Sequence, residues 1–282
     1  MTTTTGSILV TGATGHVGRH LVAELRRAGA SVRALTRRPD VADLPTGVDV
    51  VEGDFDSLPS GVFDGVEAAF IFPADGAVEF VKAAAAAQVP RLVLLSSLAA
   101  ALEHERDHGS ASQLHHAAIE EALRATEAEW TILRPGTFAN NLLSWAPSIR
   151  YTGGVSGPYP TSAQAPIHEA DVAAAAAAAL LQPGRGGEIH AMTGPEALTR
   201  REQLAVIGTA IGRELTFTEN SPEEFAAEMR QYGVGDSIIT MLLDYWSDTV
   251  DQPDAVRRTE LLNGRASRTL AEWARDHAAD FA

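Results

Sequence analysis

A glycine-rich loop near the start of the chain most restricts how it folds. Residues 11–18 are Thr-Gly-Ala-Thr-Gly-His-Val-Gly, between an apolar run at residues 8–10 and a stretch with helical periodicity. In such a loop Gly12 permits a tight turn, Gly15 lets the backbone approach a pyrophosphate and Gly18 lets helix and strand pack closely. The alternative is a purely structural glycine turn. The motif predicts a dinucleotide site formed by Gly12, Ala13, Thr14, Gly15, His16, Val17 and Gly18.

Short runs rich in Val, Ile and Leu recur after this loop and alternate with helical patterns. Because the runs are apolar at consecutive positions, both faces of each strand are expected to be covered, as in a parallel sheet between helices. We therefore predict an α/β fold, a Rossmann-type doubly wound parallel sheet with a smaller, mainly helical C-terminal cap region. The predicted strands are Ile8–Val10, Val32–Leu35, Val48–Val51, Ala68–Phe72, Leu92–Leu95 and Trp130–Leu133.

The composition changes after Arg134. Residues 135–166 are rich in Gly, Pro, Ser and Asn, which predicts loops around a ligand cleft. A helix over 171–181 and a strand over 188–192 then continue the α/β pattern. Three capping boxes mark later helix starts. We expect an NAD(P)-binding Rossmann domain over residues 1–193, cleft loops included, and a substrate-binding cap over residues 194–282. The capping boxes are Thr199 with Glu202, Ser221 with Glu224 and Thr269 with Glu272.

The second predicted strand is followed by Thr36-Arg37-Arg38-Pro39, where an NAD-binding protein places an acid for the ribose hydroxyl. Arg37 offers a planar cation to a 2′-phosphate instead, with Arg38 beside it. The pair predicts NADP(H) as the cofactor, and a solvated surface arginine is the alternative. Asp54 and Phe55 follow the third strand and are predicted to contact adenine, although an Asp in a turn is also ordinary.

The charge and composition exclude several classes of partner. Lys and Arg number 22 against 37 Asp and Glu, giving a formal charge of −15. Such a chain repels phosphate backbones and anionic lipids, so we expect neither nucleic acid nor membrane as a partner. There is no cysteine, which excludes disulfides and thiolate metal sites. The first six residues lack the basic and apolar segments of a signal peptide, so a cytoplasmic protein is expected.

Several further sequences accompany the glycine loop: Val32 to Arg37, Gly53-Asp54, Trp130 to Gly136 and Glu272 to His277. Together they resemble the atypical short-chain dehydrogenase/reductases of the NmrA-like type, across nearly the whole chain. The resemblance implies an NADPH-dependent reductase of quinones, azo dyes or triphenylmethane dyes, or a cofactor-sensing regulator that catalyses nothing. It also implies a set of residues around the nicotinamide: Phe72, Pro73, Ala74, Ser96, Ser97, Gly136, Phe138 and Asn141. Of these, Ser97 and Asn141 are assigned to the substrate side.

The wider superfamily uses a Tyr-x-x-x-Lys pair to protonate the substrate, and this chain lacks it. Its only lysine is Lys82, while His116 and Glu120 have similar spacing where the pair is expected. We interpret His116 as a candidate proton donor because histidine titrates near neutral pH, with water as the alternative. Hydride transfer to a quinone or another conjugated acceptor depends less on a protein acid than hydride transfer to a ketone does.

Two other histidine motifs need an interpretation. Residues 104–108 match the His-Glu-x-x-His zinc signature, but Gly109-Ser110 would break the helix that zinc binding requires. We therefore predict a polar loop beside the cleft and no metal. His168, in a predicted cleft loop before a helix, is expected to face the substrate.

We predict an NADPH-dependent oxidoreductase that transfers hydride to a small-molecule acceptor, quinone-like or extended and conjugated. A nonenzymatic NADP(H)-sensing protein is the main alternative. An epimerase of nucleoside-diphosphate sugars is a weaker one, because its hydride cycle also relies on the missing tyrosine. The oligomeric state stays open, a homodimer being one arrangement.

Overall fold

The computed structural model describes residues 6–257, 262 and 264–282. They form two compact units, each described by itself below. The first unit comprises residues 6–135, 169–192, 262 and 264–265, and the second comprises residues 136–168, 193–257 and 266–282. This division differs from the expected single boundary after residue 193. Residues 136–168 belong to the second unit because their strands pair with strands that follow residue 193.

The first unit contains a seven-stranded sheet in the order β3-β2-β1-β4-β5-β6-β9, with every pair parallel. The chain moves outward from β1 to β3 and then crosses to β4, so β1 and β4 flank the point where the direction of winding reverses. Open α/β sheets bind ligands at this point. The strands are β1 Ser7–Thr11, β2 Ser31–Thr36, β3 Asp49–Glu52, β4 Val66–Ile71, β5 Arg91–Leu95, β6 Glu129–Pro135 and β9 Glu188–Met192.

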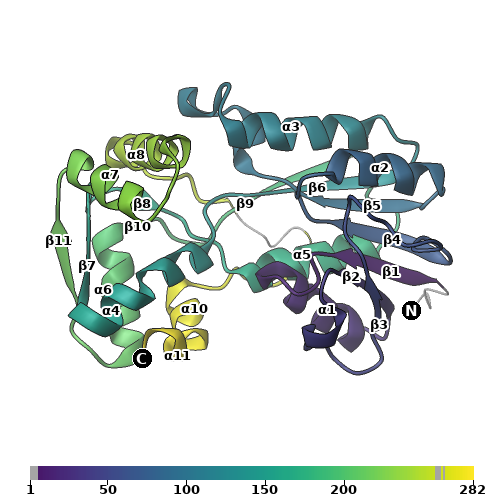
Figure 1. Ribbon diagram of the computed structural model, residues 1–282, viewed down its shortest axis with the longest axis horizontal. Helices are drawn as coiled ribbons and strands as arrows, with labels where there is room; N and C mark the ends of the chain where they lie inside the picture. The colour runs from purple at the N-terminus through teal and green to yellow at the C-terminus, as the bar shows by residue number, and fades with distance from the viewer. Residues whose placement is uncertain (1–5, 258–261, 263) are drawn as a thin grey trace. The chain divides into compact units, whose positions relative to one another are not determined.

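Helices cover both faces of this sheet (Figure 1), with α1 and α5 on one face and α2 and α3 on the other. Helix α5 is buried almost throughout, and its run of alanines lets α1 pack closely on it. The helices are α1 His16–Arg27, α2 Ala77–Ala86, α3 Ala111–Arg124 and α5 Glu169–Leu181, with 3-10 turns η1 Pro39–Val41, η2 Leu98–Ala101 and η3 Glu105–Asp107. The predicted doubly wound parallel fold and its strands are confirmed.

The second unit is mainly helical and carries two small two-stranded sheets, β7 with β11 and β8 with β10. Its core gathers Leu204, Ile207 and Trp273. All three predicted capping boxes are present. Its elements are η4 Ala139–Trp145, α4 Ala146–Thr152, β7 Gly154–Gly157, β8 Ala163–Gln164, β10 Leu198–Thr199, α6 Arg200–Ile211, β11 Thr216–Glu219, α7 Pro222–Gln231, α8 Asp236–Asp251, α10 Leu270–Asp276 and α11 Ala278–Phe281.

The expectation of loops alone over residues 135–166 is wrong, since α4, β7 and β8 lie there. These elements are short, and each strand pairs with a strand that lies well beyond it in the sequence. A local pattern does not reveal such pairing. None of the helices in the described ranges has both the length and the hydropathy that crossing a bilayer requires.

Candidate cofactor-binding site

The glycine loop connects β1 to α1 and leaves the helix start open. Gly12 has φ +62°, and its carbonyl accepts a hydrogen bond of 2.9 Å from the Gly15 amide. Gly15 then serves as the extended N-cap of α1, without a side-chain cap, and the first turn holds no acidic residue. The first-turn amides of a helix have no partner within the helix and carry positive potential. This geometry fits a bound phosphate.

The loop also lacks room for side chains at two of its glycines. A Cβ built on Gly18 would lie 2.0 Å from the Gly12 carbonyl oxygen, and one on Gly15 would lie 3.2 Å from the same atom. Gly18 therefore permits the close packing of α1 against the loop. Gly12 is required for another reason: its φ lies in the left-handed region, which glycine adopts without steric cost.

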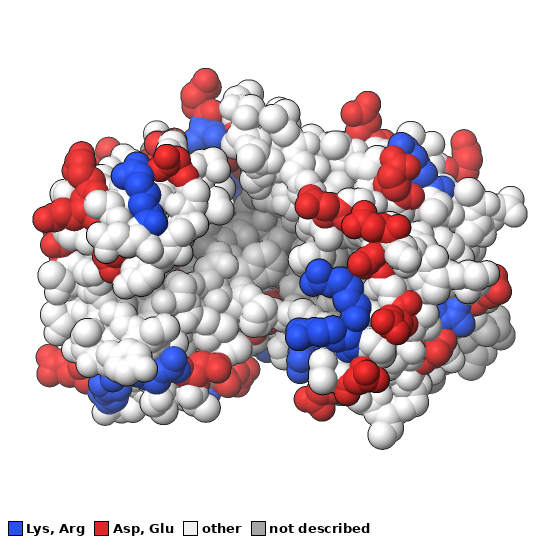
Figure 2. Space-filling model, viewed as in Figure 1, with Lys and Arg blue, Asp and Glu red and all other residues white. Residues whose placement is uncertain are grey.

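The end of β2 presents two arginines to solvent. Arg37 and Arg38 follow Thr36, the last residue of the strand, and both side chains are exposed. Within the described ranges neither guanidinium has a hydrogen-bond or ion-pair partner. Figure 2 shows Lys and Arg side chains gathered on one face of the first unit, in a chain whose formal charge is −15. Two free guanidinium groups in this place suit an anionic group of the cofactor.

Asp54 and Phe55 have structural roles. The Asp54 Oδ1 accepts hydrogen bonds from the Asp56 and Ser57 amides, at 3.1 and 2.9 Å, and so closes a turn. The ring of Phe55 packs against Phe80, with centroids 4.7 Å apart, at the edge of the core below α2. Their predicted contact with adenine stays a prediction.

Phe72 lies directly beside the glycine loop. Its amide donates to the Thr11 Oγ1 over 2.8 Å, and the same hydroxyl donates to the Phe70 carbonyl over 2.9 Å. A Cβ on Gly12 would lie 3.0 Å from the Phe72 side chain, which is 43% exposed. The hydroxyl of Thr11 therefore joins the ends of β1 and β4. Pro73 and Ala74 continue this segment toward α2, and the Pro73 carbonyl lies 3.0 Å from the Nε2 of His115.

A buried carboxylate occupies the ends of β5 and β6. Glu120 of α3 is 1% exposed and accepts hydrogen bonds from Arg134, Arg124 and Ser96. Burial acts to raise its pKa, but the hydrogen bonds from Arg134 and Ser96 and the two arginine charges hold the pKa of Glu120 below its ordinary value. The Ser96 hydroxyl is thus committed to Glu120 at 2.5 Å. The contact of Ser96 with the nicotinamide stays a prediction. The Ser97 hydroxyl accepts from the Ala99 amide and caps η2.

Four predicted residues belong to the second unit. Phe138 forms a bridge with Ile167 just after Gly136, and Asn141 is exposed in η4. His168 is buried, with its Nε2 3.3 Å from the Asp276 Oδ2. Because the His168 side chain is buried, this position weighs against a direct contact with the substrate. The contact of His168 with the substrate stays a prediction.

Comparison with known proteins identifies the family. A family model described as NAD(P)H-binding matches residues 12–183, more than half of the chain. The chain belongs to this family. The match begins at Gly12 and includes the rest of the glycine loop, Arg37 and Arg38, so the predicted nicotinamide dinucleotide cofactor is confirmed.

Several relatives of this NAD(P)H-binding protein are named as reductases. One, from Streptomyces griseus, is a (4-alkanoyl-5-oxo-2,5-dihydrofuran-3-yl)methyl phosphate reductase, 38% identical and covering 98% of this chain and 99% of its own. An NAD(P)H azoreductase from Xenophilus azovorans is 28% identical over 97% of this chain and 99% of its own. The crystal structure of an NADPH-dependent quinone oxidoreductase from Escherichia coli superposes with a TM-score of 0.79, at 26% identity, covering 95% and 98% of the two chains. The predicted resemblance to NmrA-like reductases is confirmed.

Relative to the wider superfamily, this member has no tyrosine–lysine pair on α3. Sequence analysis predicted His116 near the position of that tyrosine. Burial, with the neighbouring His115, lowers the pKa of His116 from 6.5 to about 4. Its Nδ1 is buried without a hydrogen-bond partner in the described part of the chain. The ring is therefore uncharged at neutral pH and does not carry the additional proton that a proton donor would give up. A role for His116 as proton donor stays a prediction, and its lowered pKa weighs against it.

The zinc-like motif does not form the helix that its chemistry requires. Residues 105–107 form a 3-10 turn, η3, flanked by His104 and His108 in extended conformations. The two histidines are therefore not one α-helical turn apart on a common face.

Sequence analysis missed two side chains that organise this edge of the sheet. Thr11 joins the ends of two strands, and a hydroxyl at the last strand residue before a glycine loop was a usable signal. His115 contacts Pro73, but nothing in the sequence distinguished it from its neighbour His116.

Proposed function

We propose that this protein is an NADPH-dependent reductase that transfers hydride to a small, electron-poor conjugated acceptor such as a quinone or an unsaturated carbonyl compound. The observation that carries the proposal is the start of α1 at Gly15, which has no side-chain cap, together with the guanidinium groups of Arg37 and Arg38, which have no partner among the described residues. The relatives support the acceptor class, because their names specify an oxo-dihydrofuran, an azo and a quinone acceptor.

The residues have the following roles in this proposal. Amides of residues 12–18 hold the pyrophosphate, and Arg37, with Arg38, holds the 2′-phosphate. Phe72 to Ala74, Gly136 and Phe138 border the nicotinamide, while Ser97, Asn141 and His168 are assigned to the substrate. When bound, NADPH supplies the hydride.

The accompanying proton is best supplied by water. His116 is uncharged at neutral pH, and the Glu120 carboxylate is occupied by two arginines and a serine. A conjugated acceptor spreads the charge that the hydride brings, so its product takes a proton from solvent without a strong protein acid. The acceptor thus gains one hydride and one proton. Orientation of the two reactants supplies much of the rate.

Residues 194–282 are proposed to form the substrate-binding cap. A homodimer and a cytoplasmic location stay predictions of the same proposal. Small-molecule turnover requires neither a nucleic-acid partner nor a metal.

A panel of quinones, azo dyes and enones tests the proposal, with NADPH oxidation followed by absorbance. We expect saturable turnover with at least one acceptor, and its loss in the Gly18→Ala variant. Tight NADPH binding without turnover of any acceptor would favour a cofactor sensor, which the missing tyrosine–lysine pair makes the second candidate. A protein partner recovered with the cofactor-loaded chain would strengthen that reading.

A further inference from the structure

The connection from β4 to α2 forms hydrogen bonds with two side chains of other elements, Thr11 and His115. Thr11 accepts from the Phe72 amide at 2.8 Å. On the other side, the Nε2 of His115, from α3, lies 3.0 Å from the Pro73 carbonyl oxygen. A carbonyl only accepts, so Nε2 must carry the proton and donate it.

Pro73 depends on this contact more than another residue would. Proline has no amide hydrogen, so its carbonyl is its one backbone group able to form a hydrogen bond. In the described ranges, His115 is the partner of that carbonyl. Beside it, the Ala74 amide donates back to the Phe72 carbonyl over 2.9 Å, which makes a tight local turn.

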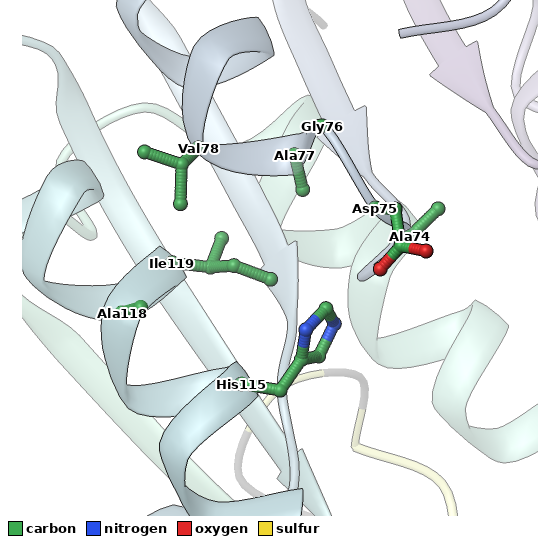
Figure 3. Close-up of a pocket in the computed structure, with 8 residues that line it drawn as sticks. All are labelled: Ala74, Asp75, Gly76, Ala77, Val78, His115, Ala118 and Ile119. Carbon is green, nitrogen blue, oxygen red and sulfur yellow. The ribbon is translucent and has the colours of Figure 1, made fainter. Parts of the chain in front are cut away.

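Packing supports this segment weakly on the side of α3. A pocket of about 180 Å³ is lined by residues 74–78, at the start of α2, and by His115, Ala118 and Ile119 of α3. Figure 3 shows the His115 ring reaching from α3 toward Ala74 and Asp75, while the small side chains of Ala77 and Ala118 leave the space open. The segment is therefore positioned by the hydrogen bond more than by a filled core.

We propose that His115 is a positioning residue for Phe72, acting through the Pro73 carbonyl. Phe72 is 43% exposed and lies against Gly12, so its ring borders the place where the glycine loop receives the cofactor. Loss of the His115 donor would free the Phe72–Ala74 turn and let the ring move. The inference rests on the proposed function for its kinetic consequence but not for its structural one.

The structural consequence is measured on the chain without cofactor, by hydrogen exchange. In His115→Ala, we expect the hydrogen-bonded amides of Phe72 and Ala74 to exchange about tenfold faster or more, because local opening becomes easier. His115→Gln, whose amide nitrogen can donate from a similar position, should restore much of the protection. Leu114→Ala is the matched control, since Leu114 is the exposed neighbour of His115 on the same helix. Unchanged exchange in a folded His115→Ala or, should that variant not fold, no protection in His115→Gln would overturn the proposal.

The kinetic consequence is measured with a double-mutant cycle. His115→Ala should lower kcat/KM with NADPH by about five- to tenfold, as the loss of one hydrogen bond implies. In a Phe72→Ala background the same change should have an effect of less than about twofold, because the ring that His115 positions is absent. An undiminished loss in that background would show that His115 acts elsewhere.

The two measurements separate two kinds of failure. If the wild-type chain reduces no acceptor, the proposed function fails while hydrogen exchange still tests the positioning. If turnover is normal and exchange at Phe72 and Ala74 does not respond to His115→Ala, the positioning fails alone.

Discussion

Arg134 forms a bidentate contact with Glu120, in which the Arg134 Nε lies 2.8 Å from the Glu120 Oε1 and the Arg134 Nη2 lies 2.6 Å from the Glu120 Oε2. The contact joins α3 to β6 inside the first unit. Because the carboxylate is buried, removing its charge leaves two arginines without their counterion. We expect Glu120→Gln to lower the free energy of unfolding by about 3 kcal/mol in urea titrations. Glu79→Gln, at an exposed ion pair with Lys82, should change it by less than about 1 kcal/mol. Equal effects would contradict the assigned role.

The half-buried His116 makes stability depend on pH. Its pKa is 6.5 in the unfolded chain and about 4 in the folded one, because burial and His115 disfavour the charged ring. Between these values the unfolded chain binds a proton that the folded chain does not, so stability is full above 6.5 and falls as the pH drops toward 4. We expect His116→Phe to remove part of this loss, at most about 3 kcal/mol. Parallel stability curves for variant and wild type from pH 7 to about 4 would rule the effect out.

Arg37 should decide between the two cofactors. Arg37→Asp replaces the proposed phosphate ligand with a carboxylate that repels the 2′-phosphate and accepts from a ribose hydroxyl. We expect NADPH affinity to fall by about 100-fold while NADH affinity holds or improves. Arg27→Asp is the control, because Arg27 is also exposed in the first unit but pairs with Glu24. Equal losses for both cofactors would contradict the assignment.

The prediction for Gly18 follows from the space around it. A methyl group there would meet the Gly12 carbonyl oxygen at 2.0 Å, so either the loop or α1 must shift. We expect Gly18→Ala to weaken NADPH binding at least about tenfold and to destabilise the fold by about 1–3 kcal/mol. At Gly235, the N-cap of α8, the same substitution meets nothing within 4 Å. Gly235→Ala should therefore leave NADPH binding unchanged and cost about 1 kcal/mol or less as a poorer helix cap. Wild-type affinity in Gly18→Ala would show that the cradle tolerates a side chain.

The sheet of the first unit was predictable because most of its strands are apolar at consecutive positions, and because β1, β4 and β5 are each followed by a helical pattern. Gly12 and Gly18 were predictable for a similar reason, since their conformational and steric demands are local to the loop. The capping boxes at Thr199, Ser221 and Thr269 are also local, as each needs only a partner three residues away.

What sequence analysis missed depends on distant contacts. The strands β7 and β8 pair with segments well beyond them in the chain. Glu120 was noticed for its spacing from His116, yet its partners Ser96 and Arg134 come from other elements of the sheet. Whether His115 or His116 reaches Pro73 depends on how α3 is rotated against β4, which helical periodicity alone does not determine.

Calorimetric titration of the pure protein with NADPH and, separately, with NADH tests the central claim most directly. We predict one saturable site per chain for NADPH, with an affinity at least about tenfold higher than for NADH, because Arg37 and Arg38 receive the additional phosphate. Absence of binding heat with both cofactors, or tighter binding of NADH, would contradict the account.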